Sequence, residues 1–145
     1  MKIFCDTSVL VARSVAAHPH HDRATVALKP IISGKDKGYI STHGAAEFYA
    51  TLTGLPLNPR IHPRDAQLTL QTSILPHFQM VELGTEEYLE AIERVSSRGL
   101  ASGMIYDALH LIAAERAGVE QILTFDVQHF SLVADEQSRP LIRAP

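Results

Sequence analysis

A helix that is apolar on almost every side is the feature that most restricts how this chain can fold. It fills the first half of the stretch Met104–Phe130 and stops at Gly118, after which Gln121–Thr124 reads as a short strand. A helix without a polar face indicates burial, and a buried strand directly after it is typical of an α/β pattern. The rest of the chain is therefore expected to follow such a pattern.

Two acids in this stretch have no cationic partner nearby in the sequence. Asp107 lies within the helix, on a row with the apolar residues Met104, Leu111 and Ala114, and no Lys or Arg lies three or four positions away. An ionised carboxylate on such a row costs free energy unless its charge is compensated. Asp126 follows directly after the strand. Together the two acids suggest a bound cation.

Length and composition limit the class of protein. With 46% hydrophobic and 20% charged residues, the chain has an ordinary globular composition, and its length of 145 residues predicts one domain, residues 1–145. The apolar runs are too short for a membrane span, residues 1–20 are not a signal peptide, and the single Cys5 suits a reducing compartment, so we expect a cytoplasmic protein. The formal net charge of −3 is not that of a basic nucleic-acid-binding protein, so any attraction for nucleic acid must come from a local patch or a bound metal.

Short apolar runs alternate with helical patterns along the whole chain. The predicted strands are Lys2–Cys5, Tyr39–Ile40, Phe78–Leu83 and Gln121–Thr124, with Leu132–Val133 and Leu141–Ile142 as candidates for an edge strand. Six or seven helices separate them. This alternation predicts an α/β domain with three layers, in which right-handed crossovers cover both faces of a short, mostly parallel central sheet of four to five strands.

Capping residues, glycines and prolines predict where the helices begin and end. The first helix is capped by Thr7 and Ser8, and the second starts with Pro19, ends at about Lys29 and is followed by turn residues 30–38. The later helices are expected at His43–Thr53, from Pro63 to Pro76 and from Thr85 to Gly99, before the apolar helix, and the final residues from Arg139 to Pro145 read mainly as a tail.

Two further acids lie at positions that can face one edge of the sheet. Asp6 ends the first strand, at the carboxyl edge where open α/β sheets bind ligands, although a simple helix-capping role explains it equally well. Glu47 lies in the helix His43–Thr53, off its apolar face and beside small residues, although a single Glu on a helix is usually just solvated. Helix starts that follow parallel strands face the same edge, so these two acids can converge with Asp107 and Asp126.

The eight His residues are scattered, apart from the cluster His18-Pro19-His20-His21. This cluster suits either a transition-metal ligand set or, more commonly, the solvated start of a helix.

Converging acids must hold protons or bind a cation. Two ionised carboxylates about 4 Å apart repel each other by about 4 kcal/mol at an effective dielectric of about 20. All-oxygen ligands favour Mg²⁺ or Mn²⁺ over zinc. An open, carboxylate-bound Mg²⁺ suits hydrolysis of a phosphodiester, because it lowers the pKa of a water molecule and neutralises charge that develops on the phosphate.

Four segments together resemble the PIN-domain ribonucleases, and most closely the VapC-type toxins of prokaryotic toxin–antitoxin pairs. The segments are Phe4–Leu10, Ala45–Phe48, Tyr106–Ala114 and Leu123–Phe130, and they occur in the family's order along nearly the whole chain. The resemblance implies a PIN-like fold and an Mg²⁺-dependent endoribonuclease that hydrolyses RNA, with Mn²⁺ as a substitute. It also implies a homodimer and a cognate antitoxin protein whose tail covers the active site.

Position by position, the resemblance implies that Asp6 and Asp107 are the main metal ligands and that Asp126 completes the acidic metal site. It implies that Glu47 binds metal or orients the attacking water. All four acids are thus candidate catalytic residues.

The last segment departs from the pattern of many relatives. Where they carry a further acid, this chain has Phe125 before Asp126 and His129 after it, so the resemblance does not extend to a second, tightly held metal ion. The hydroxyl groups of Thr7 and Thr124 are expected to steady the site through hydrogen bonds.

Other interpretations account for less of the sequence. A dehalogenase-like phosphatase also has an Asp after its first strand, but it needs a second Asp where this chain has Ser8, and it needs a late Lys although no Lys follows Lys37. A receiver-type signalling domain needs the late Lys as well. The alternative that stays open is a catalytically weak PIN module that binds RNA or an antitoxin partner without cleavage, and the presence of all four acids argues against it.

Overall fold

One parallel sheet forms the centre of the computed structural model, which describes residues 1–145. Five strands pair in the order β3-β2-β1-β4-β5, and every pair is parallel. The strands are β1 (Lys2–Cys5), β2 (Lys37–Ser41), β3 (Phe78–Val81), β4 (Gln121–Leu123) and β5 (Ile142–Arg143). The predicted short, mostly parallel sheet is therefore confirmed, and it contains no antiparallel pair.

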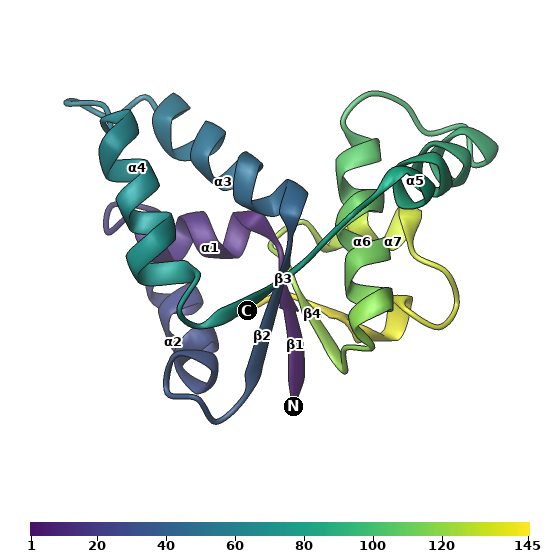
Figure 1. Cartoon of the computed structure of the whole chain (residues 1–145), viewed down its shortest axis with the longest axis horizontal. Helices are drawn as coiled ribbons and strands as arrows, with labels where there is room; N and C mark the ends of the chain where they lie inside the picture. Colours follow the sequence, from purple (N-terminus) through teal and green to yellow (C-terminus); the bar gives the residue numbers. More distant parts are fainter.

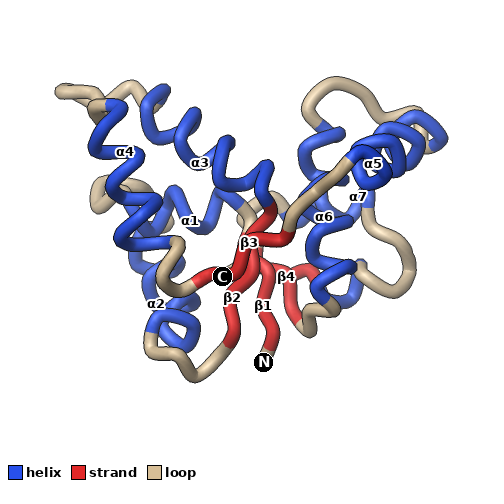
Figure 2. The backbone as a smooth tube through the Cα atoms, viewed as in Figure 1, coloured by secondary structure: helices blue, strands red, loops and turns tan.

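Helices cover both faces of this sheet (Figures 1 and 2). One face carries α1 (Thr7–Ser14), α2 (His21–Ile32), α3 (Thr42–Gly54) and α4 (Pro63–Thr69), which continues into a π-helical turn (Leu70–Ile74). The other face carries α5 (Thr85–Ser97), α6 (Met104–Ala117) and α7 (Val127–Val133), and a 3-10 turn (Arg139–Leu141) precedes β5. The three-layer α/β/α fold is thus confirmed. No helix in the chain has both the length and the apolar character needed to cross a membrane.

The alternating side chains of β1 divide the core in two. Ile3 and Cys5 belong to the cluster under α1–α4, whereas Phe4 belongs to the cluster under α5–α7. All three are almost completely buried. A central strand of a parallel sheet is covered on both faces, which explains why this run is continuously apolar until Asp6.

The all-round apolar helix of the sequence is α6. Every residue from Ala108 to Ala114 is buried, because the helix packs against β2, α5 and α7. The helix stops at Gly118, whose φ of 62° lies in the left-handed region that glycine adopts without Cβ strain.

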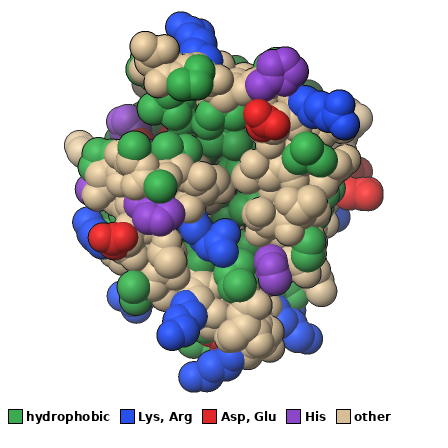
Figure 3. Space-filling view, turned by 90° about the vertical axis from the view of Figure 1, so that its left-hand side faces the viewer, with side chains coloured by type: hydrophobic (Ala, Val, Ile, Leu, Met, Phe, Trp, Pro, Cys, Tyr) green, Lys and Arg blue, Asp and Glu red, His purple; other side chains and the backbone are tan.

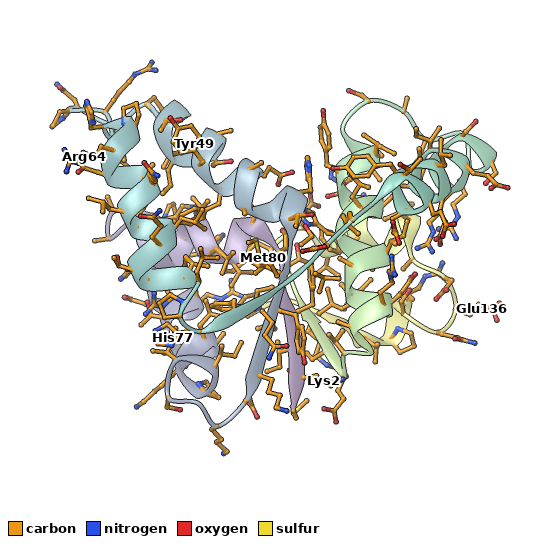
Figure 4. The ribbon with its side chains drawn as sticks, viewed as in Figure 1. Lys2, Tyr49, Arg64, His77, Met80 and Glu136 are labelled. Atoms are coloured by element: carbon orange, nitrogen blue, oxygen red, sulfur yellow. The ribbon has the colours of Figure 1, made fainter.

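The register of β1 and β4 brings two chain segments together at the carboxyl edge of the sheet. Cys5 pairs with Leu123, so the residues that follow, Asp6 and Thr124, leave the sheet side by side. Lys2, labelled in Figure 4, marks the opposite, amino end of β1. Asp6 therefore stands at the edge where ligands bind in open α/β folds.

Two predictions near the C-terminus are wrong. Of the two candidates for the edge strand, Leu132–Val133 is not a strand but the end of α7, whereas Leu141–Ile142 is confirmed within one residue by β5 at Ile142–Arg143. The last residues are also not a tail, since the Arg23 guanidinium donates a hydrogen bond to the Pro145 carbonyl oxygen at 2.8 Å.

The predicted ends of the second helix are also wrong. The helix α2 begins at His21, after Pro19, and runs through Pro30 to Ile32. Pro30 lies in the last turn, where it removes only one helical hydrogen bond. The next residue, Ile31, is buried in the core, and its packing favours one more helical turn.

Gly38 in β2 leaves no space for a side chain. A Cβ atom at this position would lie 2.6 Å from Ile31 Cγ2 and 2.6 Å from Phe78 Cδ1. Both neighbours are buried, so we expect Gly38→Ala to lower the free energy of unfolding by about 1–3 kcal/mol. Gly54→Ala at the end of α3 is the matched control, because nothing lies within 4 Å of its Cβ position. Chemical denaturation measures both variants, and equal stabilities would contradict the tight packing around β2.

Candidate active site

One cleft at the carboxyl edge of the sheet collects all four predicted acids. It has a volume of about 590 Å³, and its lining includes Asp6, Glu47, Asp107 and Asp126. Asp6 follows β1, Glu47 lies in α3, Asp107 lies in the first turn of α6, and Asp126 follows the segment that leaves β4. What each carboxylate can do there depends on its immediate neighbours.

Asp6 is buried and is held by two hydroxyl groups. Ser8 Oγ donates to Asp6 Oδ2 at 2.6 Å, and Thr124 Oγ1 donates to the same oxygen at 2.9 Å. The carboxylate accepts no hydrogen bond from the backbone at the start of α1, so helix capping does not explain it. Because both hydroxyls engage Oδ2, the other oxygen is free of them, and Oδ1 lies 3.7 Å from His110 Nε2.

The hydrogen bonds expected from the two threonines form only in part. Thr124 Oγ1 contacts Asp6 as expected, but Thr7 Oγ1 is buried without a partner. Ser8 takes its place, because it bonds Asp6 and also accepts a hydrogen bond from the Phe125 N–H at 3.2 Å. The sequence did not distinguish Ser8 from Thr7, since only the fold shows which of two adjacent hydroxyls points toward Asp6.

Asp107 is half-buried and has no hydrogen-bonding or ion-pairing partner in the protein. Burial of its carboxyl group, together with the nearby charge of Asp6, raises the pKa of Asp107 to about 6. Asp107 therefore lacks a cationic partner in the folded structure, just as it lacks one nearby in the sequence. The charges of His110 and His129 lower this pKa only in part, so a cation that enters the cleft would stabilise the ionised form further.

Glu47 is enclosed by two histidines that the sequence analysis did not connect with the site. His43 Nε2 lies 2.9 Å from Glu47 Oε2, and His110 Nε2 lies 3.5 Å from Glu47 Oε1. Burial alone would raise the pKa of Glu47, but the hydrogen bonds and charges of His110 and His43 hold it well below its usual range. Glu47 is therefore ionised at neutral pH.

His110 is buried at the centre of this network. Burial alone would lower its pKa, but the hydrogen bond with Glu47 and the charge of Asp6 raise it overall. The interpretation of the histidines as scattered is thus wrong for His43 and His110. Their only signal in the sequence is helical spacing, since His43 stands four residues before Glu47 and His110 three after Asp107.

Asp126 caps α7 and pairs with His129. It accepts a hydrogen bond from the His129 backbone N–H at 3.3 Å, and its Oδ2 lies 2.6 Å from His129 Nδ1. Its side chain is 46% exposed. The residue three positions after Asp126 is thus a histidine that engages its carboxylate.

The cluster His18-Pro19-His20-His21 does not assemble a set of three metal ligands. The His20 ring stacks on Phe125 at 4.5 Å between centroids, and His21 Nδ1 lies 3.0 Å from the Ala12 carbonyl oxygen. His18 and His20 line the cleft and so contribute to its wall.

Basic side chains do not form one continuous patch on the face of α2 and α4. Figure 3 shows Lys and Arg at several separate places on this face, among apolar and uncharged polar side chains. This face thus has no broad basic surface, and with a net charge of −3 the attraction for a polyanion must come from a local patch or a bound metal.

The donor groups of the cleft suit a hard divalent cation. Asp6, Asp107 and Asp126 offer carboxylate oxygens, which Mg²⁺ and Mn²⁺ prefer. The lone Asp107 carboxylate and the buried, unpartnered Thr7 hydroxyl are polar groups that the protein itself leaves unsatisfied. The three carboxylates do not form a group within 4.8 Å of one another. This spacing suits Mg²⁺ held directly by one or two carboxylates, with water completing its shell.

The fold is that of a PIN domain. The family model described as "PIN domain" matches residues 3–136, and the chain therefore belongs to the PIN-domain family. Within the family it is related to the VapC ribonuclease toxins. It is 32% identical over 132 residues to Ribonuclease VapC40 of Mycobacterium tuberculosis, and the match covers 85% of each chain.

Solved structures show the same fold at lower identity. The Mycobacterium tuberculosis toxin VapC20, which cleaves the sarcin-ricin loop, superimposes with a TM-score of 0.68 at 20% identity, over 88% of this chain and 92% of that one. FitAB bound to an IR36 DNA fragment superimposes with a TM-score of 0.70 at 16% identity, over 99% of this chain and 94% of that one. VapBC2 from Rickettsia felis, bound to a DNA fragment from its promoter, superimposes with a TM-score of 0.69 at 16% identity, over 100% of this chain and 99% of that one.

The raised pKa of Asp107 predicts how its replacement changes stability. Its folded pKa of about 6 exceeds the ordinary value of 3.8, so the folded protein binds more protons between these values and loses stability as the pH rises through this range. In metal-free protein at about pH 7.5, we expect Asp107→Asn to be more stable than wild type by about 1 kcal/mol, after discounting for its partial exposure.

Denaturation in EDTA at a series of pH values measures this gain, which should vanish toward about pH 4. Asp65→Asn, at an exposed position in the first turn of α4, is the control and should show no gain. A gain that does not change with pH would contradict the assignment to Asp107 ionisation.

Proposed function

We propose that this protein is an Mg²⁺-dependent endoribonuclease, the toxin of a type II toxin–antitoxin pair, and that it hydrolyses RNA phosphodiester bonds in the acidic cleft. The observation that carries the proposal is Asp107, a half-buried carboxylate without a protein partner whose pKa is raised to about 6 by burial and by Asp6. Perturbed carboxylates in a cleft are typical of functional sites. The relation to Ribonuclease VapC40 supports RNA as the substrate.

Asp6 and Asp107 are the residues that would mainly hold Mg²⁺, and the more exposed Asp126 would complete the acidic site. When bound there, Mg²⁺ would lower the pKa of a coordinated water and neutralise charge on the scissile phosphate. Asp6 is prepared for this role, because Ser8 and Thr124 fix one of its oxygens and thereby fix the direction of the other.

Glu47 orients the attacking water rather than removing its proton. The hydrogen bonds from His110 and His43 keep its pKa well below the usual range, so its carboxylate is a weak base but a dependable hydrogen-bond acceptor. Its placement in the same cleft as Asp6 and Asp107 allows it to hold a water molecule in a fixed direction.

We further propose that a cognate antitoxin protein binds this chain and that the toxin forms a homodimer, as the resemblance to VapC-type toxins implies. The similarity to FitAB and VapBC2, which are toxin–antitoxin complexes, supports the antitoxin partner.

A cleavage assay on structured RNA tests the nuclease proposal. Protein treated with EDTA should not cut RNA, and Mg²⁺ or Mn²⁺ should restore cleavage. Asp107→Asn and Asp6→Asn should each lower the rate by about 100-fold or more, because each removes a ligand charge. Asp65→Asn, outside the cleft, is the control and should retain full activity. Cleavage that persists in EDTA, or an active Asp107→Asn protein, would exclude the mechanism. RNA that binds to the protein without being cut would favour the alternative, a catalytically weak PIN module.

Ser8→Ala tests the support that Asp6 receives. Loss of the 2.6 Å hydrogen bond leaves Asp6 free to rotate, so we expect metal affinity or cleavage to fall by about 10–100-fold. Ser14→Ala is the matched control in the same helix, because its hydroxyl bonds only the Leu10 carbonyl oxygen. Titration of Mg²⁺ in the cleavage assay measures both, and an unchanged Ser8→Ala protein would show that the hydroxyl is dispensable.

A further inference from the structure

We propose that His43, Glu47 and His110 form a second metal site that binds one transition-metal ion of the zinc type. One ligand atom from each of these side chains lies within 4.8 Å of the other two. No other group of three or more His, Cys, Asp or Glu side chains in the chain shares this geometry. The site lies beside the acidic centre and differs from it in donor chemistry.

The distances suit a single ion. Two ligand atoms about 2.1 Å from one tetrahedral ion lie about 3.4 Å from each other. His110 Nε2 is 3.5 Å from Glu47 Oε1, and His43 Nε2 is 2.9 Å from Glu47 Oε2. A small rotation of the His43 side chain therefore admits the ion. The fourth position remains for water or for Asp6 Oδ1, which is 3.7 Å from His110 Nε2.

His110 has the second partner that metal-bound histidines commonly have. Its Nδ1 lies 3.0 Å from Ser41 Oγ, which already accepts the Gly44 N–H at 2.8 Å. A hydroxyl oxygen can accept two hydrogen bonds, so Nδ1–H can donate to it. When an ion replaces the Nε2 proton that His110 donates to Glu47, the Nδ1–H contact keeps the ring oriented with the Nε2 lone pair toward the ion, and a ligating His fixed in this way is typical of metal sites.

The other ligands are also held in place before any ion binds. His43 stands one helical turn before Glu47 in α3, and its ring stacks on Tyr106 with 4.8 Å between centroids and an interplanar angle of 11°. The His110 side chain is only 2% exposed. Because the stack and the burial restrict both rings, binding requires little further ordering of side chains.

The donor set selects the kind of ion. Two imidazole nitrogens and one carboxylate suit Zn²⁺, Co²⁺ or Ni²⁺, whereas Mg²⁺ prefers oxygen ligands and keeps several waters. The histidine site should therefore bind Zn²⁺ or Co²⁺ in the presence of excess Mg²⁺. The acidic carboxylates, which offer oxygen ligands alone, should be occupied by the excess Mg²⁺ under the same conditions.

Occupation of this site would remove Glu47 from the cleft chemistry. This consequence rests on the proposed nuclease function, in which Glu47 orients the attacking water. A bound zinc-type ion would hold the Glu47 carboxylate as a ligand, so it should inhibit Mg²⁺-dependent cleavage. The binding step itself does not depend on any nuclease activity.

Cobalt titration tests the site directly. The EDTA-treated full chain is titrated with Co²⁺ in millimolar Mg²⁺, and the visible d–d bands and calorimetry report one imidazole-bound ion. His43→Gln keeps an N–H that can donate to Glu47 but removes the imidazole ligand, so it should weaken binding by about 100-fold or more. His77→Gln is the control, because His77 lies far from the cleft beside β3 (Figure 4), and it should bind Co²⁺ like wild type.

The outcomes separate the metal site from the alternatives. Equal Co²⁺ affinity in wild type and His43→Gln overturns the proposal. A loss of binding in His18→Gln alone also overturns it, because that result would assign the ion to the cluster His18–His21. No Co²⁺ binding by folded wild type also overturns it and leaves a hydrogen-bonded His–Glu–His network. In the cleavage assay, Zn²⁺ should inhibit wild type more strongly than His43→Gln, each relative to its own rate. Co²⁺ binding without any RNA cleavage would refute the nuclease proposal and leave this site standing.

Discussion

The parallel pairing of β1 with β4 is the constraint on which the site depends. β1 is buried on both faces at the centre of the sheet, and a shift of one residue in its register would turn every side chain to the other face. The pairing of Cys5 with Leu123 therefore fixes Asp6 next to Thr124. The buried Asp6 carboxylate is satisfied by hydroxyl groups and pairs with no Lys or Arg, and the basic group near it is His110 Nε2 at 3.7 Å.

The negative charge of Asp6 acts on both sides of the cleft. Burial raises the pKa of Asp107, and the Asp6 charge raises it further because two carboxylates repel each other. The hydrogen bond with Glu47 raises the pKa of His110, and the Asp6 charge adds to this because an anion favours the imidazolium. Asp107 has no partner and so favours a cation, whereas Glu47 already has two histidine partners. The cleft thus has an acidic half and a histidine half, and the two halves favour different ions.

Most of the fold could be predicted, because burial on both faces makes each parallel strand a short apolar run. The errors occur where local patterns are ambiguous. Leu132–Val133 is apolar and short enough for a strand, but it packs as the end of α7. Pro30 reads as a turn, but the burial of Ile31 extends α2 past it. Tertiary packing overrode local propensity in both places.

The site could be predicted only in part. The four acids share a signal, since each follows a strand or stands early in a helix whose start faces one sheet edge. Ser8, His43 and His110 carry no such signal. A hydroxyl or imidazole becomes part of a site through the atoms it contacts, and its residue type alone is compatible with many surface roles.

By itself, the sequence determined the alternation of strands and helices and the edge at which the acids lie, because both follow from local periodicity and from where each strand ends. Only the tertiary structure decided which groups surround each acid. Asp6 and Thr124 are 118 positions apart, and Ser41 and His110 are 69 apart. Contacts over such separations depend on strand register and helix packing, so the burial, the hydrogen bonds and the pKa of each site residue are properties of the folded chain.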